Sequence, residues 1–229
     1  MQPDIVQNIH VQLAQAADDA THLKTGRRLT TPIIRAISSQ AFVQVRQYDK
    51  AHIFNLCDTL LSSRSAAERT IAFDWAYRCG KSFEEADFAR FEGWLQDYVT
   101  DWGGCDDFST HAFGRLVYQY PATLPQVMAW TPSANRWLRR ASAVVLIYGI
   151  RKGEFFSAAF QIADALLTDS DDMVQKGYGW MLKEVSKRTP LPVFDYVMAR
   201  KRTMPRTALR YAIEKLEPSL RQQAMLRDG

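Results

Sequence analysis

The sequence predicts an all-α fold made of stacked helix pairs, and three observations lead to this prediction. Apolar residues recur at the three- and four-residue spacing of amphipathic helices along most of the chain. Strand signals are nearly absent: the β-branched run at 144–147 lies inside a longer helical pattern, and no Asn-Gly or Asp-Gly turn joins two such runs. Amphipathic segments that begin with a cation also recur along the chain, which is typical of repeat proteins.

Three helices are expected in the N-terminal part. Apolar residues at helical spacing run from 5 to 22, and the Gly-Arg-Arg sequence at 26–28 then breaks the pattern as a turn. Thr31-Pro32 supplies a cap and a first-turn proline for a second helix that continues to Val45. Leucine and isoleucine residues between 53 and 61 predict a third helix.

The repeat consists of a cation followed by small and bulky apolar residues. The steps between the four cations are 71, 36 and 34 residues, and the register missing from the first step falls at Cys105-Asp106. Shorter apolar helices lie between these segments, so each unit is expected to be a helix pair and the stack a HEAT-like α-solenoid. The four cations are Arg69, Arg140, Lys176 and Arg210. The second helices that should line one face are expected near 65–79, 105–119, 133–151, 170–187 and 204–216.

Composition is that of an ordinary globular chain of 229 residues, with 47% hydrophobic and 24% charged residues. We expect one α-solenoid domain over 1–229, with the repeat clearest over 65–216. The formal charge of +4 and the pI of about 9.0 permit nucleic-acid binding without establishing it.

The cysteine content and the hydropathy of the chain limit the cellular compartments in which the protein is expected. The three cysteines are widely spaced and form no CxxC pair, so neither a disulfide framework nor a zinc site is predicted. No signal-peptide pattern is seen, and no apolar run approaches the ~20 residues of a membrane span. We therefore expect a cytoplasmic monomer in a reducing environment, without membrane contact.

Equivalent positions of successive second helices in a solenoid point to the same surface, normally the concave one. The four cations would then form a stripe, and Arg136 lies one turn before Arg140 on the same helix face. Because duplex DNA presents a dense row of phosphates, this stripe predicts a concave, basic DNA-binding face. A solvated face without a ligand is the alternative.

Asp106 is the exception in this row of cations. A carboxylate on a phosphate-binding face repels the ligand, so either the stripe is misread or the charge has a specific task. Trp102 precedes Asp106 by four residues and Trp180 follows Lys176 by four, which would place two indoles beside the carboxylate. The alternative is that Trp102 is a core residue and that Asp106 caps a helix starting near it.

Three blocks in this order resemble the AlkD-like family of bacterial DNA alkylation repair glycosylases. They are Trp102-x-x-x-Asp106, Trp-Leu-Arg-Arg-Ala at 137–141, and Gln-Lys-x-x-Gly-Trp-x-Leu-Lys-Glu at 175–184, and the likeness runs over about 68–216. Where the family often has an aromatic residue before the first Trp, this chain has Asp101.

The resemblance implies a HEAT-like fold whose concave face binds duplex DNA and an enzyme of base excision repair. Such an enzyme hydrolyses the N-glycosidic bond of N3- and N7-alkylated purines. By this resemblance Asp106 is the catalytic carboxylate, Trp102 and Trp180 contact the deoxyribose of the lesion, and Arg140 holds the DNA backbone beside it.

The residue types agree with this chemistry. An N3- or N7-alkylpurine is already cationic, so the enzyme mainly has to stabilise the positive charge that grows on the sugar, for which a carboxylate and indole faces are suitable. No metal or cofactor is expected, because His10, His22, His52 and His111 lack ligand spacing. A noncatalytic DNA- or protein-binding scaffold is the alternative function, whereas a nucleophilic hydrolase is disfavoured because no GxSxG motif occurs.

Overall fold

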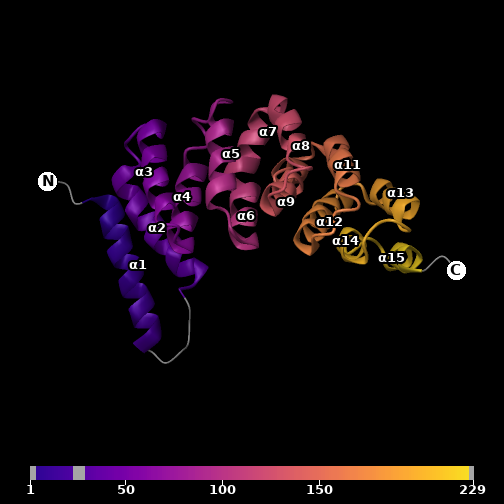
Figure 1. The fold of residues 1–229 in the computed structure, drawn as a ribbon, viewed down its shortest axis with the longest axis horizontal. Coiled ribbons are helices and arrows are strands. Elements are labelled where there is room, and N and C mark those ends of the chain that lie inside the picture. Colours follow the sequence, from indigo (N-terminus) through magenta and orange to yellow (C-terminus); the bar gives the residue numbers. More distant parts are fainter. Residues whose placement is uncertain (1–3, 23–28, 227–229) are drawn as a thin grey trace. The chain divides into compact units, whose positions relative to one another are not determined.

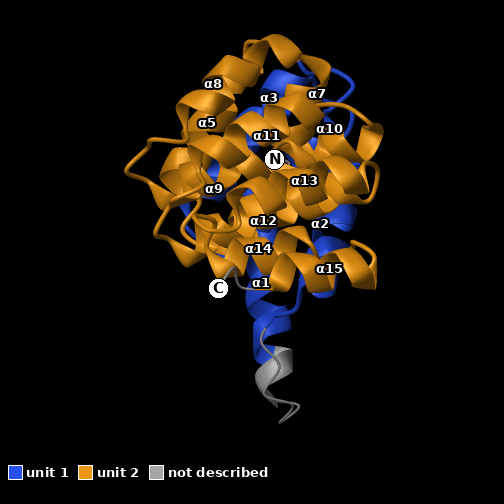
Figure 2. Ribbon diagram, turned by 90° about the vertical axis from the view of Figure 1, so that its right-hand side faces the viewer, with its two compact units in different colours: residues 1–83 blue, residues 84–229 orange. Residues whose placement is uncertain are grey.

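The computed structural model describes residues 4–22 and 29–226, and within these ranges the secondary structure is helical without any β-strand (Figure 1). The all-α prediction is confirmed. The chain divides into two compact units, residues 1–83 and residues 84–229 (Figure 2). The prediction of one domain stays a prediction, because compact units of a repeat protein need not fold separately.

The described part of unit 1 contains four helices, and α4 contacts each of the other three. The first two helices have the predicted limits, but the N-cap of the second is Thr30 and not Thr31. The third begins three residues earlier than its first predicted apolar position, because the side chain of Asp49 accepts a hydrogen bond from the His52 amide at 2.7 Å and caps it. The predicted turn at 26–28 lies outside the described residues. The helices are α1 (Ile5–His22), α2 (Thr31–Val45), α3 (Lys50–Ser62) and α4 (Ala66–Arg78).

A polar cluster in unit 1 joins α2 to α4. Asp74 is buried and accepts hydrogen bonds from Nη1 of Arg35 at 2.9 Å and from Oγ of Ser38 at 2.5 Å. Nε of Arg78 donates to the same carboxylate at 2.9 Å. Three side chains therefore compensate the burial of this charge.

Unit 2 is a row of helix pairs. The second helices contact one another in order, α6 with α9, α9 with α12 and α12 with α14, while α11 and α13 also contact α12. The helices are α5 (Asp87–Tyr98), α6 (Trp102–Phe108), the π-helix η1 (Ser109–Phe113), α7 (Gly114–Gln119), the 3-10 helix η2 (Pro121–Thr123), α8 (Leu124–Ala129), α9 (Arg136–Val144), α10 (Ile147–Lys152), α11 (Phe156–Ala165), α12 (Asp172–Ser186), α13 (Pro190–Arg200), α14 (Arg206–Ala212) and α15 (Pro218–Met225).

The predicted second helices of unit 2 are present with two differences. The segment expected at 105–119 begins at Trp102 and contains a π-helical turn, which commonly marks functional sites. The segment expected at 133–151 is interrupted between Val144 and Ile147. At the end of the π-helix Gly114 is needed for close packing, since a Cβ there would lie 2.4 Å from the Ser109 carbonyl oxygen and 2.8 Å from Cβ of Tyr148.

Ion pairs link successive helix pairs at the repeat interval. Arg140 and Asp106 are separated by 34 residues, Arg136 and Asp171 by 35, and Lys183 and Glu214 by 31. Chain segments one repeat apart are therefore neighbours in space, as the helical-repeat prediction requires.

An aromatic cluster anchors α6. Phe108 is fully buried, and its ring centroid lies 5.2 Å from that of Phe91 and 5.4 Å from that of Phe113. Because Cys105 is also fully buried, the inner face of α6 is fixed. Trp102 and Asp106, one turn apart, lie on the remaining face.

Candidate active site

A cavity of about 370 Å³ in unit 2 brings together all three residues predicted to be catalytic, Asp106, Trp102 and Trp180. Side chains from α6, α9, α12 and α14 form it, so four consecutive second helices contribute. The lining residues are Trp102, Asp106, Arg140, Met173, Lys176, Trp180, Lys183 and Tyr211.

The first wall of the cavity is the start of α6. The side chain of Asp101 is the N-cap and accepts a hydrogen bond from the Gly104 amide at 2.8 Å. The expectation that the helix starts near Asp106 is therefore wrong: Asp106 lies in the second turn and caps nothing. The cap fixes Trp102 as the first helical residue, and this residue is 60% exposed.

Asp106 and Arg140 form a bidentate ion pair. Nε of Arg140 donates to Oδ1 at 2.8 Å, and its Nη2 donates to Oδ2 at 2.9 Å. The planar fork of a guanidinium matches a carboxylate in this geometry and fixes the plane of the carboxyl group. The Asp106 side chain remains 17% exposed, toward the cavity that it lines.

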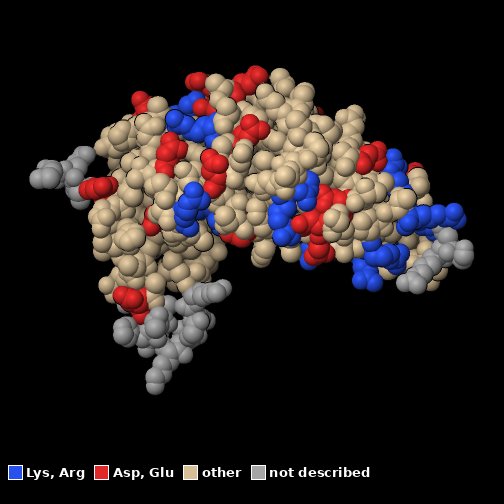
Figure 3. Space-filling view, viewed as in Figure 1, with Lys and Arg blue, Asp and Glu red and all other residues tan. Residues whose placement is uncertain are grey.

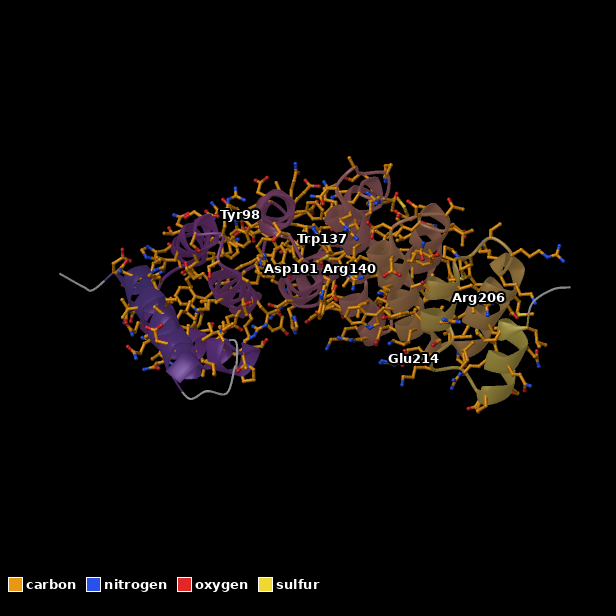
Figure 4. The ribbon with its side chains drawn as sticks, turned by 60° about the horizontal axis from the view of Figure 1, so that its bottom comes forward. Tyr98, Asp101, Trp137, Arg140, Arg206 and Glu214 are labelled. Atoms are coloured by element: carbon orange, nitrogen blue, oxygen red, sulfur yellow. The ribbon has the colours of Figure 1, made fainter. Side chains whose placement is uncertain are left out.

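Arg140 is also bonded to α12. It follows Trp137 by one turn of α9 (Figure 4), and its Nη1 donates to the carbonyl oxygen of Met173. Gly177 gives it room, because a Cβ at that position would lie 3.0 Å from Cγ of Arg140. Burial alone would lower the pKa of Arg140, but the hydrogen bonds and charge of Asp106 outweigh it and raise the pKa above its ordinary value.

One stripe of α12 forms the opposite wall. Met173, Lys176, Trp180 and Lys183 follow one another at steps of three and four residues, the spacing of one helix face. Lys176 pairs with Asp172 one turn earlier on the same helix, with Nζ 2.6 Å from Oδ2.

The fourth wall comes from α14, which approaches α12 closely. A Cβ on Gly179 would lie 2.8 Å from both the Ala208 carbonyl oxygen and Cβ of Tyr211, so only glycine permits this approach. It brings the ring of Tyr211 into the cavity, with Nζ of Lys183 5.6 Å from the ring centroid.

Met173, Lys183 and Tyr211 are cavity residues that the sequence analysis did not identify. A signal for Lys183 was present, because it follows Lys176 by seven residues, two helical turns. Tyr211 is adjacent to the predicted Arg210, and only the packing at Gly179 places its ring at the site.

The predicted DNA-binding cations lie in different environments. Arg136 pairs with Asp171 at 2.7 Å, and the predicted Arg69 is only 7% exposed, in α4 of unit 1. Arg210 is exposed and lines a neighbouring hollow between α14 and α15. Within the described ranges no carboxylate pairs with Arg210.

On the face of unit 2 that is visible in Figure 3, basic and acidic side chains are interleaved. Lys176 and Arg140 thus line the cavity as members of ion pairs and not as unpaired cations.

Cys105 lies next to Asp106 in the sequence but is not a candidate nucleophile. Burial, and secondly the charge of Asp106, raise the pKa of the Cys105 thiol to about 12, so it is not a thiolate nucleophile. No group of three His, Cys, Asp or Glu side chains that could hold a metal ion occurs in the described part of the chain. All three cysteines are buried, and none forms a disulfide.

The fold and the cavity define a helical-repeat protein with a carboxylate and two indoles at one site. The family described as DNA alkylation repair enzyme matches residues 14–216, so the chain belongs to that family. A solved structure, a predicted DNA alkylation repair enzyme from Enterococcus faecalis, is similar at 18% sequence identity with a TM-score of 0.74, covering 90% of this chain and 96% of that one. No curated protein matches.

Family membership indicates a role in alkylation repair, with DNA as the substrate. The structural likeness, at its low sequence identity, establishes the fold. None of the helices in the described ranges is both long and apolar enough to cross a membrane.

Proposed function

We propose that the protein is a DNA glycosylase that hydrolyses the N-glycosidic bond of cationic N3- and N7-alkylated purines in duplex DNA. The observation that carries this proposal is the convergence of Asp106, Trp102 and Trp180 on one cavity. These residues come from two helices 70 residues apart in the sequence, and their types suit one task, the stabilisation of a positively charged sugar.

The reaction needs little more than charge stabilisation. When the C1′–N9 bond breaks, its electron pair leaves with the purine, which departs neutral because it carried a positive charge in the substrate. The sugar becomes oxocarbenium-like, and the Asp106 carboxylate would stabilise it electrostatically. Water then adds to C1′ and loses a proton, which the Asp106 carboxylate in the cavity would accept.

The ion pair with Arg140 leaves Asp106 able to stabilise the sugar and to accept a proton. A carboxylate has about four lone-pair positions, and the bidentate pair uses two of them, one on each oxygen. The remaining positions are available to a ligand in the cavity. Arg140 also compensates the charge of Asp106, which would otherwise repel the DNA phosphates beside the lesion.

The indoles would meet the sugar through their faces. Trp102 is largely exposed and Trp180 is partly exposed, so both offer aromatic surface to a ligand. The negative face of an indole attracts the electropositive C–H groups of a sugar that is gaining positive charge. Lys176 and Lys183, on the wall formed by α12, would contact the flanking phosphates.

The direct test is incubation with duplex DNA that carries a single N7-methylguanine. We expect abasic sites to form faster than by spontaneous depurination of the same duplex without protein, and none to form in an unmodified duplex. A protein that binds this DNA but leaves depurination at the spontaneous rate would be a noncatalytic scaffold, the alternative left open by the sequence.

A further inference from the structure

Glu184 is a buried carboxylate directly behind the cavity wall and is not explained by the proposed catalytic groups. It lies one turn after Trp180 on α12, and its side chain is 5% exposed. The indole N–H of Trp180 donates a hydrogen bond to Oε1 of Glu184 at 3.1 Å. The one polar atom of this indole is thus bonded to Glu184, and what the ring offers the cavity is carbon surface.

Two cations also donate hydrogen bonds to Glu184. Nζ of Lys187 donates to Oε1 at 2.8 Å, and Nε of Arg151 donates to Oε2 at 3.3 Å. Burial would raise the pKa of Glu184, but the hydrogen bonds from Lys187, Arg151 and Trp180 outweigh it and lower the pKa below its ordinary value. Glu184 is therefore ionised at neutral pH, and the Trp180 bond is a charge-assisted one.

We propose that Glu184 is a positioning residue that also tunes the charge of Trp180: its carboxylate fixes the indole and draws the N–H proton, which makes the ring face more attractive to a cationic sugar. This inference rests on the proposed glycosylase function. The physical basis is that a cation over an aromatic ring is held by the ring's negative face, which grows stronger when electron density is pushed into the ring.

The charge of the cluster does not explain the effect without the hydrogen bond. Glu184 carries one negative charge, whereas Arg151 and Lys187 together carry two positive ones, so the cluster as a whole does not attract a cation. Only the directional bond from the indole N–H transmits the carboxylate's influence toward the cavity. The position is therefore expected to require a negatively charged acceptor, and a neutral acceptor of the same shape should not replace it.

The test compares two duplexes, each with an abasic-site analogue: one whose sugar is replaced by a positively charged pyrrolidine, and one with a neutral tetrahydrofuran. We expect the wild-type protein to bind the cationic analogue more tightly. Glu184→Gln keeps an acceptor for the indole N–H but removes the charge. It should lower the preference for the cationic analogue, and the single-turnover excision rate of N7-methylguanine, by about fivefold.

A matched control exists in the same unit. The indole N–H of Trp130 donates to Oε1 of Glu92 at 2.5 Å, and Trp130 is 3% exposed and lies outside the cavity lining. Glu92→Gln likewise keeps an acceptor for the indole N–H and removes the carboxylate, but at a core tryptophan. It should leave both the analogue preference and the excision rate of the folded protein at their wild-type values.

A second variant changes the preference in the opposite direction and does not disturb the buried carboxylate. Arg151 is half exposed, and Arg151→Met keeps much of its stem while removing one cation from Glu184. The carboxylate then draws the indole proton more strongly, and the preference for the cationic analogue should rise by about twofold.

The outcomes separate this inference from the proposed function. A wild-type protein that neither excises N7-methylguanine nor prefers the cationic analogue would overturn the glycosylase proposal. If the wild-type protein does both, a Glu184→Gln variant with an unchanged preference would overturn the inference. Equal weakening for the cationic and the neutral analogue would also overturn the charge effect, because it would mean that Glu184 only positions the ring.

Discussion

Asp74 in unit 1 and Asp106 in unit 2 are both aspartates bonded to arginine, but they differ in what their carboxylates can still bind. Asp74 is 10% exposed at its side chain and accepts bonds from three side chains, Arg35, Ser38 and Arg78. Asp106 is 17% exposed and, among the described residues, accepts side-chain bonds from Arg140 alone, and it lines a cavity with two indoles.

This difference shows why an ion pair alone does not identify a catalytic carboxylate. The surroundings of Asp74 use its lone pairs within the protein, which suits a residue that joins two helices. The surroundings of Asp106 fix the plane of the carboxyl group and leave lone pairs facing a space large enough for a ligand. The comparison therefore predicts an effect on stability at Asp74 and an effect on chemistry at Asp106.

Asp106→Asn should give the largest effect. The amide has one acceptor oxygen, so it keeps one bond to Arg140 and loses the charge that stabilises the sugar. We expect excision of N7-methylguanine, measured in single turnover with saturating protein, to fall by about 10²-fold or more. DNA affinity should stay level or rise, because a negative charge is removed from a face that meets phosphates.

Excision at the wild-type rate by the folded Asp106→Asn variant would give Asp106 the same structural role as Asp74. The protein would then retain a DNA-binding role with no assigned catalytic carboxylate. Circular dichroism and thermal unfolding of the same preparation show whether the variant is folded when the rate is measured.

The sequence predicted the helical repeats well, but it did not predict how deeply each side chain is buried. The helix limits of α1 and α2 follow from apolar spacing and a first-turn proline, both of which are local signals. Arg69 and Arg140 occupy the same register and were predicted to lie on one cationic surface. Both are in fact buried, Arg69 in unit 1 and Arg140 in its pair with Asp106. Register indicates the helix face, whereas burial depends on the neighbouring helices.

The pairing of Asp106 with Arg140 illustrates the same limit. The sequence analysis treated the carboxylate as an exception in a row of cations, although the interval of 34 residues between the two is itself the repeat interval. Residues one repeat apart are the ones that meet, so this spacing could have predicted the pair. The cavity wall formed by Tyr211 could not be predicted in this way, since it depends on close packing at Gly179.

Asp74→Asn should give the next effect, on stability. The variant removes the carboxylate charge to which Arg35 and Arg78 both donate, and each of these side chains is about one third exposed, so water partly compensates. We expect a loss of about 2 kcal/mol in the free energy of unfolding, measured with urea. Excision per folded molecule should be unchanged. If the excision rate falls under conditions in which the Asp74→Asn variant is fully folded, the assignment of stability to Asp74 and chemistry to Asp106 is wrong.

Gly177→Ala tests whether the setting of Arg140 matters for the chemistry. The added Cβ would lie 3.0 Å from Cγ of Arg140, so the side chain must shift by a few tenths of an ångström and take Asp106 with it. We expect excision to fall by about tenfold, since small misplacements of catalytic groups are costly. Alanine favours a helix over glycine by up to about 1 kcal/mol, and this gain offsets the cost of the close contact with Arg140, so the free energy of unfolding should change little.

Gly93→Ala is the matched control for this change. Gly93 lies in α5 of the same unit, and a Cβ there would meet nothing within 4 Å. The substitution should raise stability by up to about 1 kcal/mol and leave excision unchanged. If both glycine variants excise at the wild-type rate, the position of Arg140 is not critical, and its ion pair with Asp106 has a structural role like that of the arginine bonds at Asp74.

Arg210→Ala should give the smallest effect and compares the predicted cations of the two units. Arg210 is exposed in α14 of unit 2, while Arg69 is buried in α4 of unit 1. If Arg210 neutralises one phosphate, its removal should lower the slope of log affinity against log salt by about 0.9 and leave the excision rate at saturation unchanged.

Arg69→Ala, assayed on folded protein only, should leave the salt slope at its wild-type value because a buried guanidinium releases no counterion from DNA. Affinities measured for both variants between low and moderate salt decide this. Equal slopes for Arg210→Ala and wild type would remove Arg210 from the DNA interface and leave Lys176 and Lys183, beside the cavity, as the proposed phosphate contacts.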